Sequence, residues 1–220
     1  MNTYLDGEGG VFMEKSYTKI YTTGATVPLK IRPGHFATNH AHINYYIDVT
    51  TLKARTKEAE EVAQALVGMY LYDTVIDTIV CMEGTEVIGA FLAEELAKGG
   101  FLSTNAHKSI YVISPEFNNN SQIIFRDNLI PMIRDKHVMI LTGRTLNKAV
   151  ESIQYYGGIL QGASAIFSAM DSLDGVPIKS VFGKKDLPDY TYSDYRDCPL
   201  CKAGKKIDAL VNTFGYSPMG

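Results

Sequence analysis

Hydrophobic residues recur along the chain in patterns that predict alternating helices and strands. Between residues 56 and 70 they return every three or four positions, which is typical of an amphipathic helix. Residues 75–82 (VIDTIVCM) form a short apolar run with β-branched side chains, as expected for a strand buried on both faces of a parallel sheet. A second helix is predicted over residues 86–98, because Gly99 and Gly100 supply a left-handed stop after it.

The same alternation continues to residue 182. Residues 118–125 predict a hairpin, and a helix that ends at Tyr156 is closed by Gly157 and Gly158. Further strands are predicted over residues 109–114, 137–141, 163–168 and 177–182. Strands that alternate with helices of roughly ten to fifteen residues indicate an α/β fold, with a doubly wound, mostly parallel sheet flanked by helices.

Composition divides the chain into three segments. Residues 1–15 are rich in glycine and acidic residues and read as an N-terminal arm, whereas residues 16–184 carry the α/β pattern. Residues 185–220 form a polar C-terminal extension that contains several tyrosines and a C-x-x-C motif. We expect this extension to pack at a homodimer contact, since exposed aromatic residues such as Tyr190, Tyr192 and Tyr195 are enriched in interfaces. The alternative is a flexible tail that contacts only its own chain.

The overall composition excludes several classes of protein. With 45% hydrophobic residues in 220, the chain can form a full core, and intrinsic disorder over most of its length is excluded. A net charge of −3 is too small for a protein that coats nucleic acid. There is no apolar run of the roughly 18 residues that a membrane span needs, and the first thirty residues lack a signal-peptide block, so we expect a cytoplasmic protein with reduced cysteines.

Two loops have a composition suited to binding phosphate. Thr142-Gly143-Arg144-Thr145 joins a buried strand to a helix, and it offers free backbone N–H groups, two hydroxyls and a guanidinium. Glu83-Gly84-Thr85 holds the equivalent place after the earlier strand. The alternative for both loops is an ordinary helix start in which a threonine caps the first turn.

Three stretches of sequence resemble the type I phosphoribosyltransferase family, and within it the orotate phosphoribosyltransferases. They are LKIRPGHFATNHAHINYYID (29–48), CMEGTEVIGAFLAEELA (81–97) and DKHVMILTGRTLNKAVESIQYYGG (135–158). The second resembles the pyrophosphate loop of the family, and the third its phosphoribosyl pyrophosphate loop. The resemblance implies a small hood-type element, Mg²⁺ if the protein is catalytic, a homodimer, and the transfer of ribose 5-phosphate to a nitrogenous base. Tyr45 and Tyr46, with Asp171 and Ser172, would lie on the side of the base.

The sequence departs from this family at three places. The family's signature strand ends in two acids that engage the ribose hydroxyls, whereas here Leu141 runs directly into Thr142. Ser172 stands where orotate enzymes have an arginine that pairs with the orotate carboxylate. Residues 115–122, in the place of the mobile loop, contain no basic residue, and Lys108 and Arg126 are the nearest candidates. Two hypotheses therefore remain: a phosphoribosyltransferase of pyrimidine nucleotide metabolism, or a non-catalytic sensor of a nucleotide or sugar phosphate.

Cysteine and histidine residues supply a second kind of candidate site. Cys198 and Cys201 have the spacing of half a zinc site, and a two-fold related chain would complete the four ligands. A redox pair and an inert reduced turn are the alternatives. His35, His40 and His42 cluster in sequence, and His40-x-His42 would place two imidazoles on one side of a strand, unless these residues have only a structural role. Cys81 is expected in the core.

Overall fold

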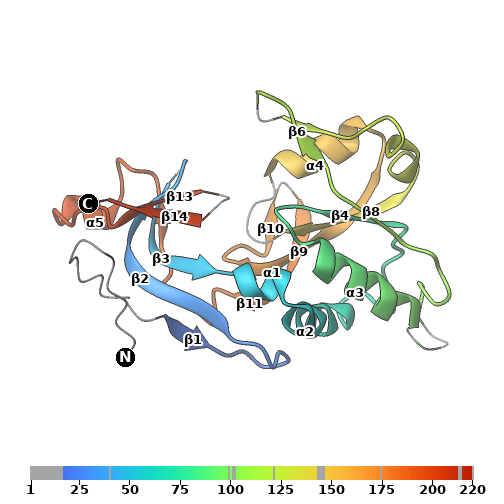
Figure 1. Ribbon diagram of the computed structural model, residues 1–220, viewed down its shortest axis with the longest axis horizontal. Helices are drawn as coiled ribbons and strands as arrows, with labels where there is room; N and C mark the ends of the chain where they lie inside the picture. Colours follow the sequence, from blue (N-terminus) through green and yellow to red (C-terminus); the bar gives the residue numbers. More distant parts are fainter. Residues whose placement is uncertain are drawn as a thin grey trace, which may run out of the picture. The chain divides into compact units, whose positions relative to one another are not determined.

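The chain folds into two compact units, and neither of them is continuous in sequence. The first contains residues 1–20, 29–48 and 190–220, and the second contains residues 21–28 and 49–189. This division differs from the consecutive one expected from composition, because the C-terminal segment adds strands to the sheet of the N-terminal segment (Figure 1). The computed structural model describes residues 17–39, 41–98, 100, 103–120, 122–142, 147–173, 175–212 and 215–219.

The second unit is built on a mostly parallel sheet, which confirms the predicted α/β fold. Within the described residues its strand order is β10-β11-β9-β8-β4-β5. All neighbouring strands run parallel except β10, which pairs antiparallel with β11 at one edge. The strands are β4 (Thr78–Cys81), β5 (Tyr111–Ile113), β8 (His137–Thr142), β9 (Ile159–Ser168), β10 (Ser172–Leu173) and β11 (Val176–Gly183).

Helices cover both faces of this sheet. The helix α4 (Asn147–Tyr155) buries Val150 and Ile153 in one core cluster with Val138 and Ile140 of β8. Side chains alternate along a strand, so Met139 points to the other face, where α2 and α3 pack against each other (Figure 1). The other helical segments are α1 (Thr50–Ala54), α2 (Thr56–Val67), α3 (Glu86–Lys98) and the 3-10 turn η1 (Ile130–Met132).

Two connections in this unit carry no α-helix among their described residues. The predicted hairpin is formed by β6 (Glu116–Phe117) and β7 (Ile123–Ile124), and the Asn118 side chain accepts the N–H groups of Asn120 and Gln122 at its turn. The link between the parallel strands β9 and β11 carries only β10 among its described residues. Parallel neighbours usually need a longer crossover through a helix; here β10 folds back along the outer edge of β11 instead.

The first unit is a second sheet, formed by segments near both ends of the chain. Its order is β12-β3-β2-β13-β14, with β1 also paired to β2, and its core contains Phe36, Ile43, Tyr46, Ala209 and Val211. The predicted C-terminal extension is therefore part of this sheet. The elements are β1 (Thr18–Ile20), β2 (Leu29–Ala37), β3 (His42–Asp48), β12 (Tyr192–Ser193), α5 (Pro199–Lys202), β13 (Ala209–Asn212) and β14 (Gly215–Pro218).

None of the helices in the described ranges of either unit combines the length and the hydrophobicity that crossing a membrane requires.

Candidate functional site

The strands β4 and β8 end side by side at the carboxyl edge of the parallel sheet, the edge at which open α/β sheets bind ligands. After β4 the chain makes a tight turn in which φ is 58° at Glu83 and 78° at Gly84. A left-handed conformation costs a residue with a Cβ roughly 1 kcal/mol or more, and it persists where the surroundings impose it. The predicted pyrophosphate loop is therefore a constrained turn.

Thr85 fastens this turn to the sheet. Its side chain is fully buried, and its Oγ1 lies 2.9 Å from the carbonyl oxygen of Met82 and 3.0 Å from that of Leu141. The backbone N–H of Met82 donates to the same Leu141 carbonyl at 2.8 Å. The helix α3 begins directly afterwards, with the N–H of Gly89 donating to the carbonyl of Thr85 at 2.9 Å. Thr85 thus joins the ends of β4 and β8 to the start of α3.

Lys53, from α1, brings a positive charge to this turn. Its ammonium group donates to the backbone carbonyl of Glu83. It also lies 3.9 Å from the position that a Cβ on Gly84 would take, and Glu86 Oε2 lies 3.9 Å from the same position. The Glu86 carboxylate accepts a hydrogen bond from Ser114 Oγ at 2.7 Å. The turn therefore has one ammonium group and the Glu86 carboxylate beside its glycine.

The first residue of the predicted phosphate loop 142–145 lies beside the Glu83-Gly84 turn. The hydroxyl of Thr142, the last residue of β8, is buried and lies 3.4 Å from Glu83 Oε2. Gly143, Arg144 and Thr145 lie outside the described residues, so the cradle that they were expected to form stays a prediction. What the structure does establish is that the strand entering this cradle ends beside the Glu83-Gly84 turn.

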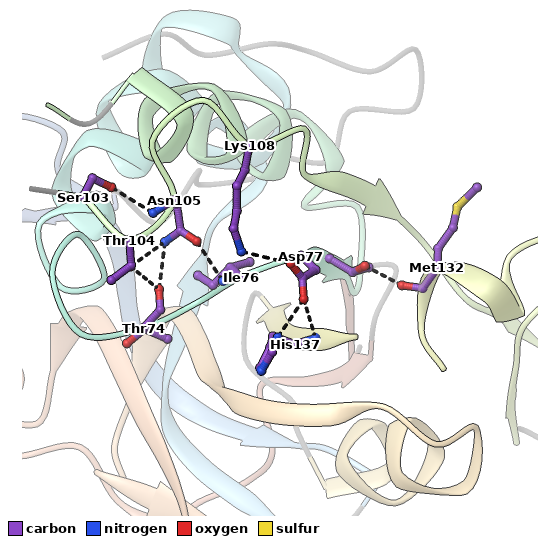
Figure 2. A network of polar contacts seen from close by, with 10 residues as sticks. Thr74, Ile76, Asp77, Ser103, Thr104, Asn105, Lys108, Met132 and His137 are labelled. Atoms are coloured by element: carbon purple, nitrogen blue, oxygen red, sulfur yellow. Dashed lines mark hydrogen bonds and ion pairs between the residues drawn. The ribbon is translucent and has the colours of Figure 1, made fainter. Parts of the chain in front are cut away.

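Lys108 lies at the opposite edge of the sheet, where β4 and β8 begin (Figure 2). Its Nζ is 3.1 Å from Asp77 Oδ1, and the other oxygen of Asp77 accepts from the backbone N–H of His137 at 3.0 Å and lies 2.7 Å from its ring Nδ1. Burial raises the pKa of Asp77, but the bonds from His137 and Lys108 outweigh it and lower the pKa to about 2. Lys108 therefore belongs to a hydrogen-bond network that links the start of β4 to the start of β8.

Arg126, the other cation considered for a leaving pyrophosphate, lies beside a shallow hollow of about 330 Å³. The guanidinium group is paired with the Glu116 carboxylate, and both side chains are largely exposed. This hollow is lined by Ser114, Pro115, Glu116, Arg126, Asn128 and Leu129. Because Ser114 follows β5, the hollow lies at the carboxyl end of that strand.

The four residues expected near the base are divided between the units. Tyr45 and Tyr46 belong to β3 of the first unit, whereas Asp171 and Ser172 follow β9 in the second. The ring of Tyr46 is buried in the core of its unit, 5.1 Å from the ring of Tyr216 between centroids. Asp171 and Ser172 are exposed, and the Asp171 carbonyl accepts from the N–H of Ile178 at 2.9 Å. Their predicted role toward a base stays a prediction.

A group of metal-binding side chains lies in the first unit. It consists of His35, His42, Cys198 and Cys201, whose ligand atoms all lie within 4.8 Å of one another. His35 Nε2 is 3.1 Å from His42 Nδ1, 3.5 Å from Cys198 Sγ and 3.7 Å from Cys201 Sγ, and His42 Nδ1 is 3.2 Å from Cys201 Sγ. This group could hold a metal ion, and the two histidines come from the same chain as the C-x-x-C motif. His40 lies outside the described residues.

The surroundings shift the pKa values of two side chains in this group. Burial and the neighbouring His35 lower the pKa of His42, against an opposing effect of Asp194, so the neutral imidazole that binds metals is favoured. Desolvation and the Cys198 thiol raise the pKa of Cys201. A bound cation would reverse the second effect by stabilising the thiolate.

The sequence indicated the cysteine pair and the histidines separately, but it did not indicate that they lie together. The C-x-x-C motif and the histidines were visible, yet His42 and Cys201 are 159 positions apart, and no spacing rule joins residues at that separation. Lys53 was also missed, because a lysine at the end of a short helix carries no motif. Only the fold places it beside Gly84.

Comparison with known proteins bears on the fold alone. No family model matches the sequence, and no curated protein sequence matches it either. Among solved structures, the chain is similar to UMP synthase of Leishmania donovani, with 17% identity and a TM-score of 0.52 over 72% of this chain and 34% of that one.

Two further similarities are weaker. Orotate phosphoribosyltransferase of Mycobacterium tuberculosis H37Rv, solved in complex with 5-phospho-α-D-ribosyl 1-diphosphate, is 13% identical, with a TM-score of 0.45 over 64% of this chain and 82% of that one. Adenine phosphoribosyltransferase of Leishmania tarentolae is 11% identical, with a TM-score of 0.42 over 64% and 78%. The chain is thus similar in structure to these three proteins at low sequence identity, and it shares a fold with UMP synthase, whose TM-score alone among the three exceeds 0.5.

Proposed function

We propose that the second unit binds a phosphate-bearing ribose compound, either phosphoribosyl pyrophosphate or a nucleotide, at the carboxyl edge of its parallel sheet. The observation that carries this proposal is the position of the Lys53 ammonium beside the Glu83-Gly84 turn, at the start of α3. A lysine ammonium and the backbone N–H groups of a helix start both favour a phosphate group. The fold similarity to UMP synthase, an enzyme named for a nucleotide, supports the same class of ligand.

A magnesium ion would bind at this edge together with the pyrophosphate group of the ligand. Glu83 and Glu86 place carboxylates near the turn, and these would repel a lone phosphate. Carboxylate and phosphate oxygens are the ligands that Mg²⁺ prefers, so both residues fit a magnesium ion that accompanies the diphosphate. The metal would neutralise part of the phosphate charge.

Two functions are compatible with such binding, and different observations favour them. The resemblance of the sequence to phosphoribosyltransferases favours the transfer of ribose 5-phosphate to a nitrogenous base. The end of β8 favours a sensor without transfer, because Leu141 and Thr142 leave no acids for the ribose hydroxyls. The described residues of the loop over 115–120 also include no basic residue to neutralise a leaving pyrophosphate. We therefore propose that the protein binds a phosphate-bearing ribose compound under either function. An enzyme assay decides whether it also transfers ribose 5-phosphate.

Titration calorimetry with phosphoribosyl pyrophosphate and Mg²⁺ tests the binding. We expect Lys53→Gln to weaken binding about tenfold or more, because a charge-assisted contact contributes about 1.5 to 3 kcal/mol. Lys57→Gln is the matched control, since Lys57 is an exposed lysine on the next helix. Arg144→Ala should weaken binding as well if residues 142–145 cradle the phosphate. Equal affinities for wild type, Lys53→Gln and Arg144→Ala would remove this edge as the binding site.

Release of pyrophosphate from phosphoribosyl pyrophosphate, measured with a panel of purine and pyrimidine bases, separates the two functions. Turnover with any base would establish a transferase. Binding without turnover on the whole panel would support the sensor.

A further inference from the structure

The four ligand atoms of His35, His42, Cys198 and Cys201 are spaced like the corners of a zinc coordination tetrahedron. Zinc bonds of about 2.0 Å to nitrogen and 2.3 Å to sulfur place neighbouring ligand atoms roughly 3.3 to 3.8 Å apart. The separations observed around His35 Nε2 are 3.1, 3.5 and 3.7 Å, and His42 Nδ1 lies 3.2 Å from Cys201 Sγ. The two remaining separations are within 4.8 Å, so one central ion could contact all four atoms after small adjustments.

The hydrogen bonding of His35 prepares its other ring nitrogen as a ligand. His35 is fully buried, and its Nδ1 lies 2.8 Å from the carbonyl oxygen of Lys205. A carbonyl only accepts hydrogen bonds, so Nδ1 carries the proton and Nε2 of the neutral ring presents a lone pair. That lone pair faces His42 and both cysteines. A second-sphere bond of this kind commonly fixes the tautomer of a metal-binding histidine.

The backbone of β2 is deformed in a way that turns His35 toward this group. Pro33 pairs with Tyr45 and Phe36 pairs with Ile43, so β2 contains one more residue than β3 over this stretch. Such a bulge redirects a side chain. The N–H of His35 is bound by the Asp208 carboxylate at 2.7 Å instead of by β3.

The C-x-x-C segment is a compact turn that presents two sulfur atoms together. Cys198 caps α5, and the N–H of Lys202 donates to its carbonyl at 3.1 Å. The turn is closed by Gly204, whose φ is 70°, and by a bond from the N–H of Lys205 to the carbonyl of Leu200 at 2.9 Å. The same Lys205 then binds His35 through its carbonyl. One short segment thus supplies two ligands and supports a third.

We propose that His35 Nε2, His42 Nδ1, Cys198 Sγ and Cys201 Sγ bind one Zn²⁺ within a single chain. Two thiolates and two neutral imidazoles are a ligand set that suits zinc, and the thiolates balance the charge of the ion. Four protein ligands leave no open position, so the site is structural. It fastens residues 198–205 to the β2–β3 hairpin and thereby joins the C-terminal segment to the N-terminal part of the first unit.

The metal content of the full chain tests this site. The protein is purified without a histidine tag, under reducing conditions and after dialysis against chelator-treated buffer, and its metals are measured by elemental mass spectrometry. We expect one zinc per chain. Cys201→Ser and His42→Asn should each lose most of the zinc. Cys81→Ala and His107→Asn are the matched controls, because both residues belong to the second unit, and these variants should keep the metal.

Cobalt substitution of the wild-type protein gives a readout that does not depend on variants folding. Replacement of zinc by Co²⁺ should produce the visible bands of a tetrahedral ion and a thiolate charge-transfer band. Half a zinc per chain in a dimer would overturn the single-chain site in favour of a shared one. Absence of metal, or a Cys198–Cys201 disulfide seen by mass under non-reducing conditions, would overturn the proposal. None of these readouts depends on ligand binding by the second unit.

Discussion

His35 and Asp208 bind each other through a reciprocal pair of hydrogen bonds. The N–H of His35 donates to the Asp208 carboxylate at 2.7 Å, and the N–H of Asp208 donates to the His35 carbonyl at 2.7 Å. These residues are 173 positions apart, and Asp208 immediately precedes β13, which pairs with β2. The bulge in β2 removes the β3 backbone partner of the His35 N–H, and the hydrogen bond to Asp208 takes its place.

Gly34 is required for this arrangement. A Cβ at position 34 would lie 2.6 Å from the ring of Phe36 and 2.9 Å from the Asp208 carboxylate. We expect Gly34→Ala to lower the free energy of unfolding by about 1 to 3 kcal/mol, the usual cost of overpacking. Urea denaturation followed by circular dichroism measures this change. In Gly68→Ala the added Cβ meets nothing within 4 Å, so this control should stay within about 0.5 kcal/mol of wild type. Equal stabilities of the two variants would contradict the packing argument.

Asp208 satisfies a buried N–H, and two substitutions separate this role from its charge. Asp208→Ala leaves the N–H of His35 without its acceptor, which costs about 1 to 3 kcal/mol. Asp208→Asn keeps an oxygen in the same place and should recover at least half of the loss. Thermal unfolding of both variants provides the measurement. If asparagine were as damaging as alanine, the charge of Asp208 rather than its hydrogen bond would be what matters.

The Asp77 network predicts a dependence of stability on pH. The pKa of Asp77 falls from 3.8 to about 2 in the folded chain, so its contribution is complete above about pH 5 and is lost as the pH falls through 2. We expect Asp77→Asn to cost about 1 kcal/mol at pH 7, less than the pKa shift alone implies, because solvent screens this partly exposed group. The difference in unfolding free energy between Asp77→Asn and wild type should become smaller as the pH falls from 4 to 2. The exposed Asp127→Asn should show no such trend.

Orotate is expected to be a poor substrate even if the protein is a transferase. Ser172 is exposed and cannot replace the bidentate, charged contact of an arginine with the orotate carboxylate. Loss of such a contact costs about 1.5 to 3 kcal/mol. An assay of orotidylate formation checks this expectation. Rates on the order of 1 per second or faster would require another carboxylate partner.

The tyrosines of the C-terminal segment remain candidates for a homodimer contact. Tyr192 and Tyr195 are 63% and 57% exposed, whereas Tyr190 packs against the core of the first unit. Because this segment contributes strands to the sheet, point substitutions test the contact better than truncation. We expect Tyr192→Ser combined with Tyr195→Ser to shift the mass measured by light scattering toward the monomer. Tyr72→Ser, which changes a similarly exposed residue of the second unit, should leave the mass unchanged. A fully dimeric double variant would exclude these side chains from the interface.

The order of elements in the second unit follows from local patterns. The predicted helix over 86–98 has the same bounds as α3, and the apolar runs at 75–82 and 137–141 contain β4 and begin β8. These predictions succeed because a parallel strand that is buried on both faces requires a continuous apolar run. A helix that is buried on one face requires apolar residues at a period of about 3.6. The sequence alone also located the carboxyl edge of the sheet, since loops after parallel strands must meet there.

Tertiary structure decided what no local pattern carries. The strands of the first unit come from segments near both ends of the chain, and the pairing of β13 with β2 depends on contacts between residues far apart in sequence. The same pairing brings the C-x-x-C turn to His35 and His42, and packing of α1 brings Lys53 to Gly84. Hydrophobic periodicity specifies which face of an element is buried but not which distant partner covers it. The grouping of the histidines with the C-x-x-C motif in the first unit, and the position of Lys53 in the second, therefore depend on which distant segments pack together.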